Sequence, residues 1–280
     1  MSHPIYRLSS IARPLEPKYP TNLAVLILLP LIGIGMAAWL VLGRDYALSS
    51  AALSGVSAMF AAFLAWALAR ELDPDRNQAA FVAMGLAVIA VGFELTPGLL
   101  LTASVLMSVR IVNRTVGPPA RLTDLVMVLL LAGAATFISG SWWAGLILAA
   151  AITLDGYLDG DPKRNIAFTA IAIALALVGW GLQGFALPDF APLWWEWTAA
   201  VVVVGGAFLA MALSCPPVKS LCDATGETLS RNRVKAAMVL ALAGGYLSLL
   251  GGLGGLTLAL PIWAAMAGVT EGRAMPKRKI

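Results

Sequence analysis

The sequence contains few of the residues on which common enzyme sites are built. Charged residues make up only 12% of the 280 positions, histidine occurs once, at His3, and there are two cysteines, Cys215 and Cys222. With a single histidine, a zinc site would lack ligands. No GxGxxG, P-loop, HExxH, GxSxG or CxxC motif occurs, so the sequence shows none of the sites that those motifs define.

Apolar residues, in contrast, make up 60% of the chain, and glycine occurs 27 times. Several apolar runs approach the roughly 20 residues that a helix needs to cross a bilayer core of about 30 Å. The sequence therefore predicts an all-α polytopic membrane protein. The basic residues are scattered over short polar stretches without interleaved aromatic residues, which favours a role in membrane topology over nucleic-acid binding.

The lysines and arginines are sorted along the chain. Eighteen of the nineteen fall in six polar stretches separated by apolar segments, and Arg44 is the exception. The six stretches contain Arg7, Arg13 and Lys18; Arg70 and Arg76; Arg110, Arg114 and Arg121; Lys163 and Arg164; Lys219, Arg231, Arg233 and Lys235; and Arg273, Lys277, Arg278 and Lys279. Because cytoplasmic loops are enriched in lysine and arginine, this pattern predicts an even number of crossings with both termini in the cytoplasm.

We expect about ten transmembrane helices, with eight as the lower bound. The predicted spans are Leu23–Leu42, Leu48–Ala69, two helices within Ala79–Val109, Leu122–Ile138, Trp142–Leu158, Ile166–Leu182, Trp195–Leu213, Val234–Leu250 and Leu256–Val269. The third, fourth and tenth are short for a full span at a rise of 1.5 Å per residue. We expect a break between the third and fourth helices at Glu94, Pro97 and Gly98. One continuous helix there would place every later loop on the opposite side of the membrane, and the basic residues of those loops would no longer share the cytoplasmic side.

Seven of the nine tryptophans favour the same orientation, because they fall at the predicted outer ends of helices, and tryptophan is enriched at membrane–water interfaces. These residues are Trp39, Trp142, Trp143, Trp180, Trp194, Trp195 and Trp197. The segment Pro188–Trp195 is expected to lie along the outer interface.

The chain is expected to comprise a cytoplasmic N-terminal segment (residues 1–22), one transmembrane helical domain (residues 23–269) and a basic cytoplasmic tail (residues 270–280). The first segment is polar and proline-rich, unlike a cleavable signal peptide. A weak internal repeat relates the second to fifth helices to the sixth to ninth, although apolar sequence of low complexity also produces such matches by chance. In the longest cytoplasmic loop, Leu221, Thr225 and Leu229 are spaced as on one side of a short interfacial helix.

Acidic residues gather in the predicted cytoplasmic loops. Asp155 and Asp159 are four residues apart and would share one face of a helix. Carboxylate oxygens of this kind suit Mg²⁺, which bridges them to substrate phosphates. The run Asp155-Gly156-Tyr157-Leu158-Asp159-Gly160-Asp161 resembles the second aspartate box of the UbiA-type membrane prenyltransferases.

This resemblance implies a Mg²⁺-dependent transferase that binds a prenyl diphosphate through the loops between helices 2 and 3 and between helices 6 and 7. Loop 2–3 departs from the family pattern, because it lacks an asparagine, contains Pro74 and is not followed by a basic segment. In both loops the same residue types also serve as ordinary turn and capping residues. The metal ligands implied by the resemblance are Asp155, Asp159, Asp161, Asp73 and Asp75, with Arg114 or Arg164 facing the diphosphate.

Two hypotheses for function follow, and the sequence leaves open whether the protein is an enzyme. No ionisable residue is predicted at mid-depth in the membrane, which argues against a proton-coupled carrier with a buried carboxylate. The leading hypothesis is a transport-like or accessory component of a bacterial or archaeal inner membrane that handles apolar or neutral partners without a cofactor. We expect its partners to include membrane lipids and other membrane subunits, but no nucleic acid. The alternative is the UbiA-like transferase with Mg²⁺.

Overall fold

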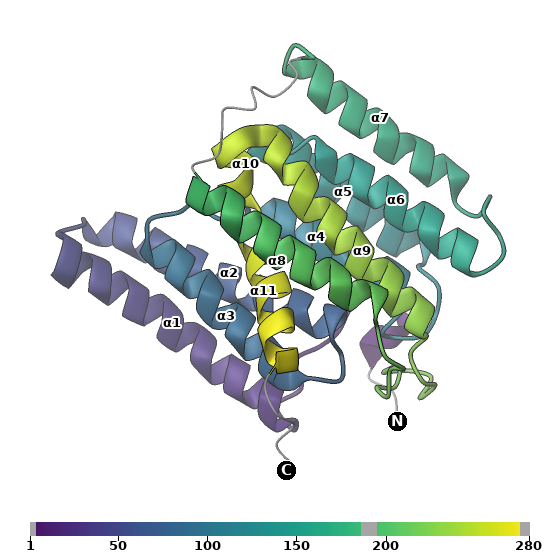
Figure 1. Cartoon of the computed structure of the whole chain (residues 1–280), viewed down its shortest axis with the longest axis horizontal. Helices are drawn as coiled ribbons and strands as arrows, with labels where there is room; N and C mark the ends of the chain where they lie inside the picture. Colours follow the sequence, from purple (N-terminus) through teal and green to yellow (C-terminus); the bar gives the residue numbers. More distant parts are fainter. Residues whose placement is uncertain (1–3, 186–194, 275–280) are drawn as a thin grey trace.

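The structure, a computed structural model, describes residues 4–185 and 195–274 and is all-α (Figure 1). The first half contains the 3₁₀ turn Pro4–Arg7, then α1 (Pro20–Arg44), α2 (Leu48–Leu72), α3 (Asn77–Gly92), α4 (Leu99–Asn113), α5 (Leu122–Ser139) and α6 (Trp143–Leu158). The second half contains α7 (Ile166–Leu182), α8 (Trp195–Leu213), α9 (Arg231–Ser248), the 3₁₀ turn Leu249–Gly251, α10 (Gly252–Leu258) and α11 (Leu260–Ala274).

The helices have the length and composition of membrane-crossing segments. Five helical stretches in the described residues are long and apolar enough to span a bilayer: Pro20–Arg44, Leu48–Leu72, Leu122–Ser139, Trp195–Leu213 and Arg231–Leu258. Four shorter apolar helices, α3, α4, α6 and α7, have 15 to 17 residues. Many large apolar side chains are exposed on the outside of the bundle, as lipid contact requires. By length and composition, the chain is therefore a multi-pass membrane protein.

Helix α4 lies at the centre of the bundle. Eleven of its fifteen residues are buried, and it contacts α2, α5, α6 and α9. By contrast, α1 and α7 lie at opposite edges (Figure 1), and only 17% of the most apolar window of α1 is buried. The buried positions are rich in alanine and glycine, which let helix backbones approach closely where lipid supplies no hydrophobic drive for association.

The prediction of two helices within Ala79–Val109 is confirmed. Helix α3 ends at Gly92, and Glu94 adopts a left-handed conformation with φ of 62°. Gly98 then precedes α4, and its amide donates a hydrogen bond of 2.8 Å to the carbonyl of Leu258. A Cβ at Gly98 would lie 2.8 Å from that oxygen, so the close approach requires glycine.

Two other predictions are wrong in detail. The predicted tenth helix Leu256–Val269 is interrupted at Ala259, which separates α10 from α11, and α11 continues to Ala274 into the expected tail. The predicted interfacial helix in the loop after α8 does not form. Leu221 pairs with Thr228 in an isolated β-bridge, and the chain reverses through Gly226 at φ of 71°. The amides of Asp223 and Ala224 donate to the carbonyls of Thr115 and Val116, so contacts with the α4–α5 loop outweigh the helical spacing.

The tryptophans at the end of the bundle near residue 140 form part of the packing. Trp142 stacks on Trp180 with ring centroids 5.6 Å apart, but Trp143 is only 3% exposed and belongs to the core instead of facing an interface. Most of the predicted interfacial segment Pro188–Trp195, including Trp194, lies outside the described residues, as does the end of the basic tail.

The contact between α3 and α11 supplies a test of the packing. A Cβ at Gly268 would lie 2.6 Å from the amide nitrogen of Ala83 and 2.7 Å from the carbonyl oxygen of Ala79. We expect Gly268→Ala to push the two helices apart and to destabilise the protein by about 1–3 kcal/mol, the usual cost of overpacking. The measurement is thermal unfolding of the purified protein in detergent.

Gly85, on α3, is the matched control because nothing lies within 4 Å of its Cβ position. Gly85→Ala should be neutral or slightly stabilising, since alanine has the higher helix propensity. Equal melting temperatures for Gly268→Ala and Gly85→Ala would show that the close approach of α3 and α11 is absent.

Candidate functional site

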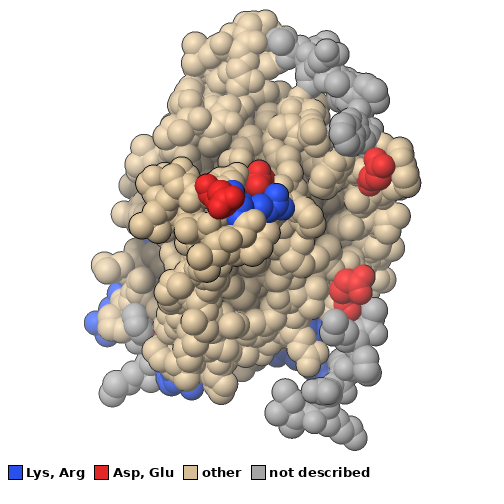
Figure 2. Space-filling view, turned by 90° about the vertical axis from the view of Figure 1, so that its left-hand side faces the viewer, with Lys and Arg blue, Asp and Glu red and all other residues tan. Residues whose placement is uncertain are grey.

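Charged side chains converge at one end of the bundle, which we call the charged end. It is formed by residues 4–19, the α2–α3, α4–α5, α6–α7 and α8–α9 loops with the adjoining helix ends, and the end of α11. Hydrogen bonds and ion pairs join these segments, and every one of the six basic stretches contributes a side chain. The face in Figure 2, by contrast, consists mostly of uncharged residues.

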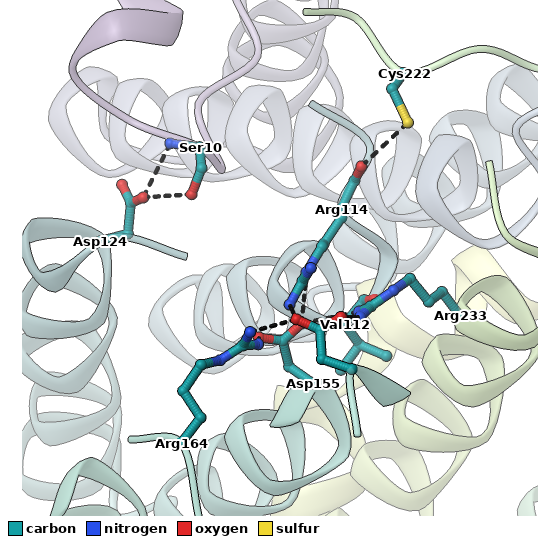
Figure 3. A network of polar contacts seen from close by, with 9 residues as sticks. Ser10, Val112, Arg114, Asp124, Asp155, Arg164, Cys222 and Arg233 are labelled. Carbon is teal, nitrogen blue, oxygen red and sulfur yellow. Dashed lines mark hydrogen bonds and ion pairs between the residues drawn. The ribbon is translucent and has the colours of Figure 1, made fainter. Parts of the chain in front are cut away.

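The densest group is an aspartate–arginine cluster formed by Asp155, Asp159, Arg114, Arg164 and Arg233. Asp155, in the last turn of α6, accepts hydrogen bonds from Arg114 at 2.7 Å and Arg233 at 2.8 Å, and it also pairs with Arg164. The three arginines point toward Asp155 from the ends of three different segments (Figure 3). Asp159 pairs with the same three arginines.

The cluster is buried on its inner side and open on its outer side. The side chain of Asp155 is 2% exposed, whereas that of Asp159 is 25% exposed. Burial acts to raise the pKa of Asp159, but hydrogen bonds from Arg114 and Arg164 outweigh it and lower the pKa to about 2. The guanidinium groups thus favour the charged form of Asp159, and the cluster contains three arginines against two aspartates.

A second network centres on Glu71, which is fully buried in the last turn of α2. Its carboxylate accepts from Arg13 at 3.1 Å and from Arg110 at 3.0 Å. Arg13 also binds Asp223 at 2.7 Å. Burial acts to lower the pKa of Arg13, but Glu71 and Asp223 raise it above its ordinary value. This network ties the N-terminal segment to α2, α4 and the α8–α9 loop.

The N-terminal segment is also fastened to α5. The hydroxyls of Ser9 and Ser10 donate to Asp124 at 2.6 and 2.7 Å, and the amide of Ser10 donates to the same carboxylate at 2.9 Å (Figure 3). Asp124 also accepts from the amide of Arg121 at the start of the helix, which satisfies an otherwise unpaired N-terminal donor.

The predicted metal-binding residues have separate partners. Asp155 and Asp159 are in the aspartate–arginine cluster, whereas Asp73 pairs with Arg273 at 3.2 Å. Asp75 accepts from the amides of Lys219 and Ser220 and from the Ser220 hydroxyl. Asp161 is exposed, and its carboxylate forms no ion pair within residues 4–185 and 195–274.

The structure brings together Asp155 and Asp159 of the predicted metal set, but Asp73 and Asp75 have partners of their own in the α11 end and the α8–α9 loop. Among the described residues, no group of three or more His, Cys, Asp or Glu side chains is placed to hold a metal ion. Arg114 and Arg164, which were expected to face a diphosphate, instead bind the aspartates. The Mg²⁺ site therefore stays a prediction.

Sequence reasoning missed the roles of Glu71 and Arg233. Glu71 lies in the last turn of α2 and is the buried centre of the second network. Arg233 was assigned only to a basic stretch, although it reaches Asp155 from the first turn of α9 and also donates to the carbonyl of Val112. The sequence does indicate a partner for Arg233, because the residue directly precedes a predicted apolar helix. A cation that is buried at such a position needs a nearby anion.

Away from the charged end, the buried polar side-chain groups of the described helices are hydroxyl and indole groups. Every Asp, Glu, Lys and Arg within the described helices lies within five residues of a helix end. On the central helix α4, the side chains of Thr102, Ser104 and Ser108 are at most 1% exposed. Their hydroxyls have no hydrogen-bond partner in the described part of the chain. Such groups are costly to bury unless something satisfies them.

Comparison of the chain with protein-family models, with curated proteins and with solved structures finds no match. The fold and composition define a multi-pass membrane protein, and the features that distinguish it are the two ionic networks at the charged end and the buried hydroxyls of α4.

We predict that Asp155→Asn strongly destabilises the protein. Loss of the buried carboxylate leaves Arg114, Arg164 and Arg233 sharing Asp159 alone, and breaking a buried ion pair costs about 3–5 kcal/mol. Thermal unfolding in detergent measures the effect. Asp161→Asn is the matched control in the same loop, and its melting temperature should equal that of the unmodified protein. A melting temperature for Asp155→Asn that also equals it would mean that the cluster contributes nothing to stability.

Proposed function

We propose that the protein is a transport-like or accessory membrane component that binds an apolar or neutral molecule within the helix bundle. The observation that supports this most is the presence in α4 of three buried hydroxyls without partners, in a bundle whose described Asp, Glu, Lys and Arg residues all lie near helix ends or in loops. Hydroxyls in an apolar interior can hydrogen-bond a neutral ligand, whereas an ion would need charged or densely polar ligands at the same depth.

The position of the hydroxyls fits this proposal. Ser104 and Ser108 are four residues apart and therefore lie on one side of α4, one turn above the other. Thr102 lies one turn before residues 105 and 106, closer to the contact between Gly98 and Leu258. A neutral molecule bound there would satisfy donors and acceptors that the described helices leave unpaired, and it would need no titratable group for binding or release.

The charged end supports an accessory or transport role because its ionic networks connect the helix ends to one another. Ion pairs among its arginines and carboxylates link the N-terminal segment, the loops and the helix ends, so the paired groups are not free to act as an acid, a base or a nucleophile. We propose that this end lies in the cytoplasm and that the membrane is the inner membrane of a bacterial or archaeal cell, since lysine and arginine favour that side.

The experiment is a thermal-shift screen of the purified protein with apolar and neutral amphiphilic molecules. A ligand that binds only the folded protein raises the melting temperature according to its concentration and affinity. We expect a stabilising ligand whose effect is lost in the double variant Ser104→Ala/Ser108→Ala and in Thr102→Val. A ligand that passes this test is then measured for flux in proteoliposomes.

Thr153→Val is the matched control, because the Thr153 hydroxyl donates to the carbonyl of Ala149 at 2.9 Å and the side chain is exposed. It should keep the full ligand response. The proposal fails if the α4 variants respond to every ligand as the unmodified protein does.

The alternative is a UbiA-like, Mg²⁺-dependent transferase acting on a lipid diphosphate. The juxtaposition of Asp155 and Asp159 with three arginines favours it, since arginines bind phosphate oxygens and aspartates bind Mg²⁺. This role would require the carboxylates to exchange guanidinium partners for metal. Turnover of a prenyl diphosphate that needs Mg²⁺ and disappears in a folded Asp159→Asn variant would establish this function and overturn the first.

A further inference from the structure

A cavity of about 400 Å³ opens at the charged end between the N-terminal segment and α2. One wall is formed by residues 6–22, and the other includes Phe63, Trp66, Ala67 and Arg70 of α2. Those four residues are spaced i, i+3, i+4 and i+7, so they line one side of the helix. From Arg70 to Phe63 this side extends about 10 Å along the helix, at 1.5 Å per residue.

The charges around the cavity leave one cation without a counter-ion. Its lining contains four basic and three acidic side chains. Glu71 pairs with Arg13 and Arg110, Asp223 pairs with Arg13, and Glu16 pairs with Lys18. Arg70 is the remaining cation. It forms no hydrogen bond or ion pair in the described part of the protein, and its Nε is buried without a partner.

Arg70 is instead held by an aromatic ring. Its guanidinium carbon lies 5.5 Å from the centroid of the Trp66 ring, within the range of a cation–π contact. Trp66 in turn stacks against Phe63, with centroids 6.2 Å apart. The contact orients the guanidinium without neutralising its charge. A partly buried, oriented and unpaired guanidinium is a site for a phosphate or carboxylate group, which it can bind through two parallel hydrogen bonds.

We infer that this cavity binds an amphiphile with an anionic head group, with the head at Arg70 and the apolar part along Trp66, Ala67 and Phe63. The apolar wall continues from Arg70 into α2, a helix long and apolar enough to cross a membrane. Trp66 is 5% and Ala67 2% exposed, so the apolar surface that a lipid would cover and a free anion would not is mainly that of the half-buried Phe63. Basic pockets between membrane helices at the headgroup level bind anionic lipids in this way. The inference goes beyond the proposed function and does not depend on it, because it involves neither the buried hydroxyls of α4 nor a transported molecule.

The test uses two lipids with identical brominated chains, phosphatidylglycerol and phosphatidylcholine, added to the purified protein in detergent. Bromine quenches nearby tryptophan fluorescence, and the signal of Trp66 is obtained as the difference between the unmodified protein and Trp66→Phe. We expect phosphatidylglycerol to quench this signal at about one-tenth of the concentration needed for phosphatidylcholine, as expected for one charge-assisted contact.

Arg70→Gln should remove the preference for phosphatidylglycerol, and Arg70→Lys, which keeps the charge, should retain most of it. Lys163→Gln is the matched control, since Lys163 is an exposed cation of the α6–α7 loop away from this cavity, and it should keep the full preference. Each variant is first checked for an unchanged melting temperature, and Arg70→Met, which also removes the charge, replaces Arg70→Gln if that variant does not fold.

Three results would overturn the inference. The first is equal quenching of Trp66 by the two lipids in the unmodified protein. The second is an unchanged preference for phosphatidylglycerol in folded Arg70→Gln. The third is loss of quenching by phosphatidylglycerol when inorganic phosphate is added at the same concentration as the lipid. This result would mean that the apolar wall contributes nothing to the binding affinity and that the site binds a free anion. Failure here leaves the α4 ligand response untouched, so the two proposals are judged separately.

Discussion

The high cost of a charge in a lipid-like interior governs the arrangement of this protein. Charged side chains within a membrane span are rare because they must be hydrated, paired or moved to an end. In the described helices all of them lie near helix ends. The same constraint acts again at the charged end, where the side chains are partly or fully buried. A carboxylate such as Asp155 or Glu71 persists there only because arginines surround it.

The ionic networks explain how short loops hold a large bundle together. The aspartate–arginine cluster connects α4, α6, the α6–α7 loop and α9, and the Glu71 network connects the N-terminal segment, α2, α4 and the α8–α9 loop. Arg110 and Arg114, four residues apart at the end of α4, each belong to a different network. The central helix is therefore anchored by both networks at its charged end.

Much of the fold follows from the sequence, because hydrophobic segments and their breaks are local features. The bounds of α5, α7 and α8 agree with the prediction within one residue, and the break around Pro97 and Gly98 was predicted from turn residues together with the distribution of basic residues. The interruption at Ala259 was not predicted, although Pro261, which lacks the N–H that a continuous helix would need, follows two residues later. The loop after α8 has helical spacing but takes its shape from hydrogen bonds to residues 115 and 116.

The site was less predictable for the same reason. A carboxylate near arginines in the sequence has the same local pattern whether it binds a metal, ends a helix or joins an ion pair. Which of these roles it has depends on the positions of distant segments. Asp155 and Asp159 were identified from their spacing, but their three arginine partners come from three separate segments. Arg70 gave no sequence signal either, because it stands out only when every neighbouring carboxylate is seen to be paired with another cation.

The central claim is that charge places one end of the bundle on one side of the membrane. The most direct measurement is labelling of single cysteines by a membrane-impermeant thiol reagent in intact cells, with Cys215 and Cys222 replaced by serine. Ala47→Cys lies in the turn between α1 and α2, and Lys163→Cys lies at the charged end; both positions are exposed. The account predicts that residue 47 is labelled in intact cells and residue 163 only after permeabilisation. Labelling of both from the same side would contradict it.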